Sequence, residues 1–206
     1  MKNIRLLRSY QSKDNQEYDC AIWEAARATA AAPTYYASVQ IGPTGRKENF
    51  IDGALGCNNP IYKLHDEAER CFDSLRKVAC VVSLGTGKRR TTQILPADRL
   101  VDKLTWNARR LMKSLKELAV DSEKSAEDMK RKYIGTDGLY YRFNVERGLE
   151  DVELADWDKL AKLRAITLGY IADPDIRLEL DKVADALVGA PTAKKAYSLG
   201  MLCKCA

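Results

Sequence analysis

A continuous apolar run between residues 77 and 84 constrains the fold most. It reads Lys-Val-Ala-Cys-Val-Val-Ser-Leu, and Gly85 follows it. A run of this kind, rich in β-branched residues and without polar alternation, is typical of a strand covered on both faces. We therefore expect a buried strand that ends at Gly85.

Helical patterns lie on both sides of this strand in the sequence. Residues 19–32 carry helix formers and meet Pro33, while Asn59 and Pro60 are the N-cap and first position expected of a helix through about residue 72. Further helices are predicted over residues 97–132, 155–172 and 174–188, the first with a leucine-rich stripe at positions 100, 104, 108, 111, 115 and 118. Packing of that stripe against a sheet is expected rather than a lipid groove.

Two further segments complete the pattern. Residues 139–145 alternate as expected of a strand with one wetter face, and residues 42–47 read as a hairpin-like turn or an exposed loop. Because helices and strands alternate around a buried strand, the sequence predicts an α/β fold. We expect a mostly parallel sheet with helices on both faces.

An acid follows a short apolar run at Asp52, directly before Gly53 and Ala54. A carboxylate at the end of a buried strand costs desolvation free energy unless it has hydrogen-bond partners or takes part in proton transfer. Gly53, and also Gly56, would allow a sharp turn of the backbone. An ordinary Asp-Gly turn is the alternative interpretation.

The segment Ala-Arg-Ala-Thr-Ala-Ala-Ala-Pro at residues 26–33, followed by the Asp52-Gly53-Ala54 motif, resembles the patatin-like phospholipase family. Residues 82–87 and 141–145 resemble later family segments in the same order, so the resemblance runs from about residue 20 to about residue 188. It implies an α/β/α layered fold. It also implies that Asp52 is the general base of a Ser-Asp catalytic dyad.

The serine of that dyad has no counterpart here. The family places it in a G-x-S-x-G elbow after a glycine-rich oxyanion loop, whereas no two glycines of this chain enclose a serine at that spacing. Ser83 precedes Gly85 and Gly87 instead of lying between them, so we expect it to be structural. The resemblance implies that the fold is incomplete at the N-terminus, with residues 1–190 forming the C-terminal part of a patatin-like domain and residues 191–206 a tail.

Composition limits the partners. The 206 residues carry a net charge of +5 without a basic block interleaved with aromatic residues, so nucleic-acid binding is not expected. No apolar run approaches a membrane span, although mild attraction to anionic membrane surfaces stays open. Six cysteines without a signal-peptide core indicate reduced thiols and a cytoplasmic setting. We expect no cofactor or metal, because His65 is the only histidine and CxxC is absent.

His65 also bears on which catalytic mechanism the chain could support. It lies in a polar helical pattern, so the sequence predicts a solvated side chain and argues against a Ser-His-Asp triad.

Two functions remain open. The chain is either the C-terminal part of a lipid acyl hydrolase that supplies only Asp52, acting on a lipid or a membrane surface, or a non-catalytic lipid-binding or interaction protein derived from that fold. An oligomer or a missing N-terminal segment would cover the open sheet edge.

Overall fold

The computed structural model describes residues 4–10, 20–33, 35–88, 122–136, 138–152, 156–189 and 197–200. The chain divides into two compact units. The first comprises Met1–Tyr62 and Leu95–Ser125, and the second comprises Lys63–Ile94 and Ala126–Ala206. The assignment of residues 1–190 to one domain therefore stays a prediction. Of the predicted tail at 191–206, the structure describes residues 197–200.

Helix α1 (Ile22–Thr29) is the first helix in the described part of the first unit. The carboxylate of Glu24 accepts a hydrogen bond from the backbone N–H of Ala21 at 2.8 Å, which satisfies one of the free amides at the helix start. The helix ends before Pro33, as predicted, although it is shorter at both ends than the predicted range 19–32. The short residues Ala28, Ala31 and Ala32 are buried at its end.

A β-hairpin follows, made of β1 (Val39–Ile41) and β2 (Glu48–Phe50). The strands are antiparallel, with Val39 opposite Phe50 and Ile41 opposite Glu48. Gly42 and Gly45 have φ angles of 126° and 85°, which side chains with a Cβ rarely adopt, so glycine is needed at both corners of the loop. The predicted hairpin-like turn is confirmed.

Two helices follow the hairpin. The short α2 (Ala54–Cys57) comes directly after the Asp-Gly motif, and α3 (Ile61–Cys71) begins after Pro60. The side-chain oxygen of Asn59 accepts from the backbone N–H of Ile61 at 3.3 Å, while its amide donates to the carbonyl of Ser122 at 3.2 Å. The predicted helix with Asn59 at its start is therefore confirmed.

The described part of the second unit holds two small sheets. β3 (Lys77–Val78) pairs antiparallel with β6 (Tyr197–Ser198), whereas β4 (Val81–Leu84) pairs in parallel with β5 (Tyr140–Phe143). The single strand predicted over residues 77–84 is thus divided in two, because its halves have different partners. Gly85 ends β4, as expected. The expected burial on both faces is wrong: Ser83 is buried, but Val81 and Val82 are only half-buried and Leu84 is 74% exposed, since β5 is the one strand that the structure describes beside β4.

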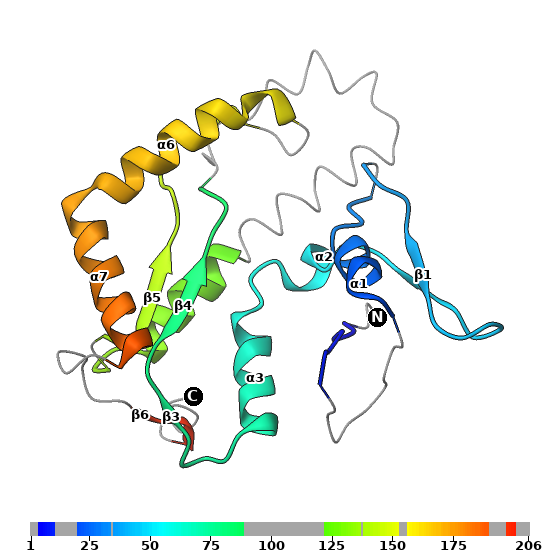
Figure 1. The fold of residues 1–206 in the computed structure, drawn as a ribbon, viewed down its shortest axis with the longest axis horizontal. Coiled ribbons are helices and arrows are strands. Elements are labelled where there is room, and N and C mark those ends of the chain that lie inside the picture. Colours follow the sequence, from blue (N-terminus) through cyan, green and yellow to red (C-terminus); the bar gives the residue numbers. More distant parts are fainter. Residues whose placement is uncertain are drawn as a thin grey trace. The chain divides into compact units, whose positions relative to one another are not determined.

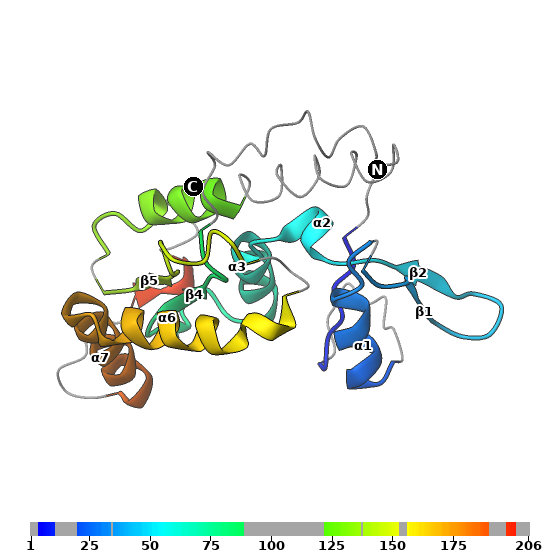
Figure 2. The same ribbon diagram turned by 90° about the horizontal axis from the view of Figure 1, so that it is seen from above.

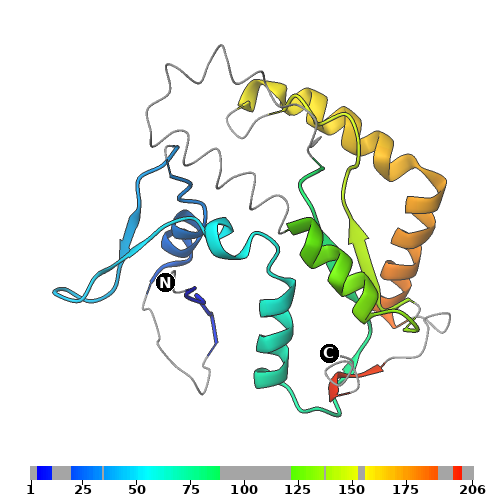
Figure 3. The ribbon, with the colours of Figure 1, turned by 180° about the vertical axis from the view of Figure 1, so that it is seen from behind.

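Two long helices cover one side of β4 and β5. The one-turn η2 (Trp157–Lys159) leads into α6 (Leu160–Ala172), and α7 (Pro174–Val188) follows. Asp173 caps α7 by accepting from the N–H of Asp175 at 3.0 Å, and Pro174 stands in its first turn. The two predicted helices are confirmed, and Figures 1 and 3 show α7 beside β5.

The core of this unit forms where α6 and α7 meet the sheet. Tyr141, Phe143 and Val183 are buried together, and further apolar side chains pack around them: Cys80, Val82, Tyr170, Ile176 and Leu180. Tyr141 and Phe143 alternate with the less buried Tyr140 and Arg142 along β5. This is the predicted alternation of a strand whose two faces differ.

Residues 122–132 are helical, and the part of this helix in the second unit, residues 126–132, lies on the opposite side of the β4–β5 pair from α6 (Figure 2). Met129 of this helix is fully buried. Just after the helix, Tyr133 stacks on Tyr140 with ring centroids 5.3 Å apart. The rest of the predicted helix 97–132, with its leucine-rich stripe, lies outside the described residues. The mixture of helices and strands agrees with an α/β fold. Because one of the three described strand pairings is parallel, a mostly parallel layered sheet stays a prediction.

Candidate functional site

Asp52 lies in the turn between β2 and α2, next to the end of α1. Its backbone N–H donates to the carbonyl of Ala31 at 3.0 Å, and that of Gly53 donates to the carbonyl of Thr29 at 3.2 Å. The buried methyl groups of Ala28 and Ala31 leave room for the two backbones to approach. The two sequence motifs, residues 26–33 and residues 52–54, are therefore joined directly through their backbones.

The carboxylate of Asp52 uses one oxygen for the turn. Oδ1 accepts from the backbone N–H of Ala54 at 2.7 Å, which fixes the side chain over the start of α2. Among the residues that the structure describes, Oδ2 has no hydrogen-bond or ion-pair partner. The side chain is half-buried. One carboxylate oxygen is thus held in place while the other can accept a proton or a hydrogen bond from another group.

The two glycines near Asp52 do not make the turn in the way that the sequence suggested. Gly53 has φ −60° and ψ −27°, which is ordinary right-handed helical backbone, and a Cβ added there would meet no atom within 4 Å. Gly56 is helical too, and its added Cβ would lie 3.2 Å from Ile4 Cγ1. The expectation that these glycines allow a sharp turn is wrong, since the hydrogen bond to Ala54 organises the turn instead.

Arg27 of α1 belongs to the Ala-Arg-Ala-Thr motif, and it holds the loop that follows the helix. Its Nη2 donates to the carbonyl of Ala37 at 3.2 Å, and its guanidinium lies 4.9 Å from the ring centroid of Tyr36. The spacing of Arg27 and Tyr36 gives no local signal of this contact. The arginine therefore connects α1 to the segment at Tyr36 and Ala37.

Ser83 has a structural role in β4. It is buried, and its Oγ accepts a hydrogen bond from Nη1 of Arg142 at 2.9 Å, directly across the parallel pair. Two residues later, a Cβ added to Gly85 would lie 2.2 Å from Oδ1 of Asn144. The serine therefore supports the sheet, in agreement with its interpretation as structural.

His65 is buried, with 7% of its surface exposed, so its expected solvated position is wrong. Nε2 lies 2.6 Å from the hydroxyl oxygen of Tyr133. Burial, and after it the positive charge of Lys132, lowers the pKa of His65. It lies one helical turn after the buried Ile61, on the same face of α3, and this spacing could have signalled its burial.

The described residues hold no group of three or more His, Cys, Asp or Glu side chains that could bind a metal ion. In the same parts of the chain, no helix is long and apolar enough to cross a membrane. The four described cysteines, at positions 20, 57, 71 and 80, form no disulfide. The candidate site consequently consists of the Asp52 turn and the backbone that holds it.

Comparisons with known proteins give the family that the chain resembles. The family model for patatin-like phospholipase matches residues 3–65, a segment that contains both motifs. The 85/88 kDa calcium-independent phospholipases A2 of Rattus norvegicus and Mus musculus are each 27% identical over 190 residues, covering 84% of this chain and 22% of theirs. The calcium-independent phospholipase A2-gamma of Homo sapiens is 30% identical over 173 residues, covering 81% of this chain and 19% of its own.

The chain spans about a fifth of the length of these curated relatives. No solved structure matches it. The segment that the family model matches contains both Asp52 and the Ala-Arg-Ala-Thr motif. The chain carries a patatin-like phospholipase segment and is homologous to the calcium-independent phospholipases A2.

Proposed function

We propose that this chain is the C-terminal part of the catalytic domain of a lipid acyl hydrolase, in which Asp52 is the general base. The observation that carries the proposal is the asymmetry of the carboxylate. Oδ1 is held by the N–H of Ala54, while Oδ2 has no partner among the described residues. A general base needs both a fixed position and one oxygen that can accept the proton.

The reaction needs two groups that this chain does not supply. A serine hydroxyl would attack the ester carbonyl while Asp52 accepts its proton, and backbone N–H groups would stabilise the oxyanion. The 206 residues contain no G-x-S-x-G segment. In the proposed enzyme, the serine and the oxyanion donors therefore come from sequence outside these 206 residues. The names of the homologous phospholipases support phospholipid esters as substrates.

A chimera tests the role of Asp52. In it, this chain replaces the matching segment of the mouse 85/88 kDa calcium-independent phospholipase A2. Asp52→Asn keeps the acceptor for Ala54 but cannot take up a proton, so kcat for phosphatidylcholine hydrolysis should fall at least about 100-fold, with the melting temperature little changed. Retained activity would show that Asp52 only forms the turn.

The chain offers a matched control in Asp73. Its Oδ1 accepts from the N–H of Leu75 at 2.8 Å, the same local geometry as that of Asp52 and Ala54. Asp73→Asn should therefore leave kcat unchanged. If both substitutions lower kcat equally, the loss reflects turn structure and not proton transfer.

The absence of a serine elbow from the sequence favours a second candidate, a non-catalytic lipid-binding or interaction protein built on the same fold. The chimera separates the two. A folded chimera that binds lipid and has no hydrolase activity supports the second candidate, whereas activity that depends on Asp52 supports the first.

A further inference from the structure

The outward side of α6 carries a row of exposed apolar side chains. Four large apolar residues lie along η2 and α6, with exposed fractions of 81%, 63%, 55% and 44% for Trp157, Leu160, Leu168 and Ile171. They are spaced so that, together with Arg164, they follow one side of the helix at intervals of three and four residues. We call these five residues the α6 stripe.

The other side of α6 faces the protein. Tyr170 packs against the core of Tyr141 and Phe143, and Ile166 approaches Gly148. The helix is therefore apolar on both sides, a composition typical of helices that are covered all round. Exposed apolar surface of this kind marks an interaction site. Figure 3 shows α6 with no other described element of its unit against its outward side.

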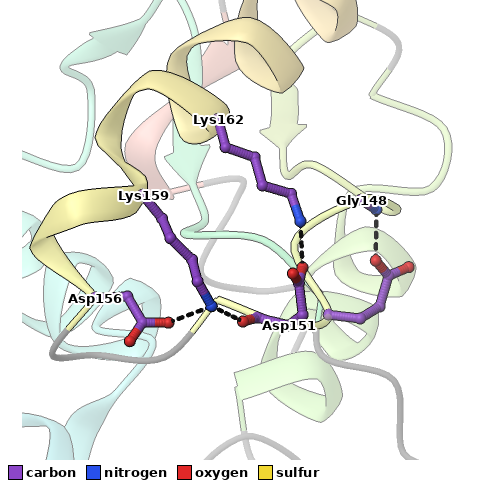
Figure 4. A network of polar contacts seen from close by, with 6 residues as sticks. Gly148, Asp151, Asp156, Lys159 and Lys162 are labelled. Carbon is purple, nitrogen blue, oxygen red and sulfur yellow. Dashed lines mark hydrogen bonds and ion pairs between the residues drawn. The ribbon is translucent and has the colours of Figure 1, made fainter.

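The charges around the stripe distinguish between partners. Leu160–Ala172 contains no acidic residue. Lys162 bonds to the carboxylate of Asp151, and Lys159 pairs with Asp156 at 2.8 Å (Figure 4). Arg164, in the middle of the stripe, makes no ion pair in the described part of the chain and is exposed.

We infer that the α6 stripe binds the surface of a lipid bilayer that contains anionic headgroups. The apolar side chains would enter the boundary of the acyl chains, Trp157 would lie at the interface, and Arg164 would extend along its aliphatic stem to a headgroup phosphate. A second copy of the chain fits less well. Stripe-to-stripe packing would bring two Arg164 side chains together, and α6 has no acid to compensate them.

Vesicle binding tests the surface without any need for hydrolysis. The 206-residue chain should sediment with phosphatidylcholine vesicles that contain phosphatidylserine. Leu168→Gln should lower the partition constant by about tenfold, because one large apolar side chain no longer enters the lipid. Ile134→Gln is the control, since Ile134 is 77% exposed but lies outside the stripe. Equal binding of wild type and Leu168→Gln, or no binding of the wild type, would overturn the proposal.

A substitution of Arg164 tests what its positive charge contributes to vesicle binding. Arg164→Gln should reduce the preference for phosphatidylserine over pure phosphatidylcholine by about fivefold, the share expected of one basic residue at an anionic surface. Arg177→Gln on α7 should leave this preference unchanged. The proposal is refuted if Arg177→Gln and Arg164→Gln weaken binding to the same extent, because nonspecific attraction by net charge would then be sufficient.

Fluorescence gives a site-specific measurement. With Trp23 and Trp106 replaced by Phe, Trp157 is the only tryptophan left in the chain. Vesicles with brominated acyl chains should quench its emission once the protein is bound, whereas bound but unquenched protein would contradict the proposal. Sedimentation of the protein without lipid tests the alternative, in which the stripe binds a second copy of the chain. A dimer that dissociates in Leu168→Gln would support this alternative.

The inference is independent of Asp52, because binding can fail while Asp52→Asn still abolishes hydrolysis.

Discussion

The ring nitrogen Nε2 of His65 and the hydroxyl oxygen of Tyr133 lie 2.6 Å apart, although the two residues are 68 positions apart in the chain. Both side chains are buried. Tyr133 in turn stacks on Tyr140 of β5, so the contact connects α3 to the parallel strand pair. A titratable group thus lies within the packed part of the second unit.

Stability should depend on pH through His65. Burial and Lys132 lower its pKa in the folded state, while Glu69 and Asp66 partly oppose them. The unfolded chain therefore binds more protons than the folded chain as the pH falls. The contribution of His65 to the free energy of unfolding is complete above its unfolded pKa of about 6.5, and it is lost as the pH falls towards the lower, folded pKa. Urea unfolding at about pH 7.5 and about pH 5 should show this loss, and His65→Gln should reduce it. An unchanged pH dependence in His65→Gln would contradict the assignment.

Tyr133→Phe should destabilise the fold by about 1–3 kcal/mol, because Nε2 of His65 would be buried without a partner. The free energy of unfolding at neutral pH measures the change. Tyr35→Phe is the control, since Tyr35 is exposed. If both substitutions have the same small effect, the hydrogen bond contributes nothing net.

Much of the local structure could be predicted because its cause is local. Asp173 and Pro174 define the start of α7, and two glycines with positive φ define the β1–β2 loop. The site is partly predictable in the same way, since an acid that follows a strand and precedes a helix can be read directly. The burial of His65 has a local signal in its spacing from Ile61, but its hydrogen-bond partner could not be predicted, because Tyr133 is 68 positions away in the sequence.

The division of residues 77–84 into two strands has a similar cause. Val78 pairs with Tyr197 and Val81 pairs with Tyr140, and neither partner is encoded in the run itself. Gly53 shows the opposite error. An Asp-Gly sequence favours a turn, but Gly53 adopts a right-handed helical conformation that any residue can adopt. The hydrogen bond from the N–H of Ala54 to Oδ1 of Asp52 already fixes the turn.

Gly85→Ala should be strongly destabilising. The new Cβ would lie 2.2 Å from Asn144 Oδ1 and 2.7 Å from Arg142 Nη2, and moving Asn144 would break its hydrogen bond from the N–H of Gly87. We expect a loss of at least about 2 kcal/mol in the free energy of unfolding. Gly169→Ala is the control, because the added Cβ meets nothing within 4 Å and alanine favours helix by about 1 kcal/mol. Equal effects of the two substitutions would show that Gly85 is not tightly packed.

Ser83→Ala should cost stability and leave ester hydrolysis unchanged. Its Oγ accepts from the guanidinium of Arg142, so removing it leaves a partly buried charge with one hydrogen bond fewer, a cost of about 1–3 kcal/mol. The isolated chain should hydrolyse a short-chain nitrophenyl ester only at the rate of buffer, because it contains no serine elbow. Turnover above background that disappears in Ser83→Ala would identify Ser83 as a nucleophile.

Gly53→Ala separates a role in folding from a role in catalysis. Its backbone is helical and the space around it is open, so the free energy of unfolding should change by less than about 1 kcal/mol. In the chimera used for Asp52, a loss of kcat at unchanged stability would show that another group approaches this point closely. Strong destabilisation would mean that Gly53 is packed against parts of the protein outside the described residues.

The strand pairings of the second unit also determine the order in which it can fold. Ser83 must find Arg142, 59 positions later, and Lys77 must find Ser198 near the end of the 206 residues. Contacts between distant residues carry a loop-closure cost and form slowly, whereas helices such as α7 form locally and fast. During synthesis on the ribosome, α3 and β4 are therefore made well before their partners exist, and the β3–β6 pair can close only after translation has passed Ser198.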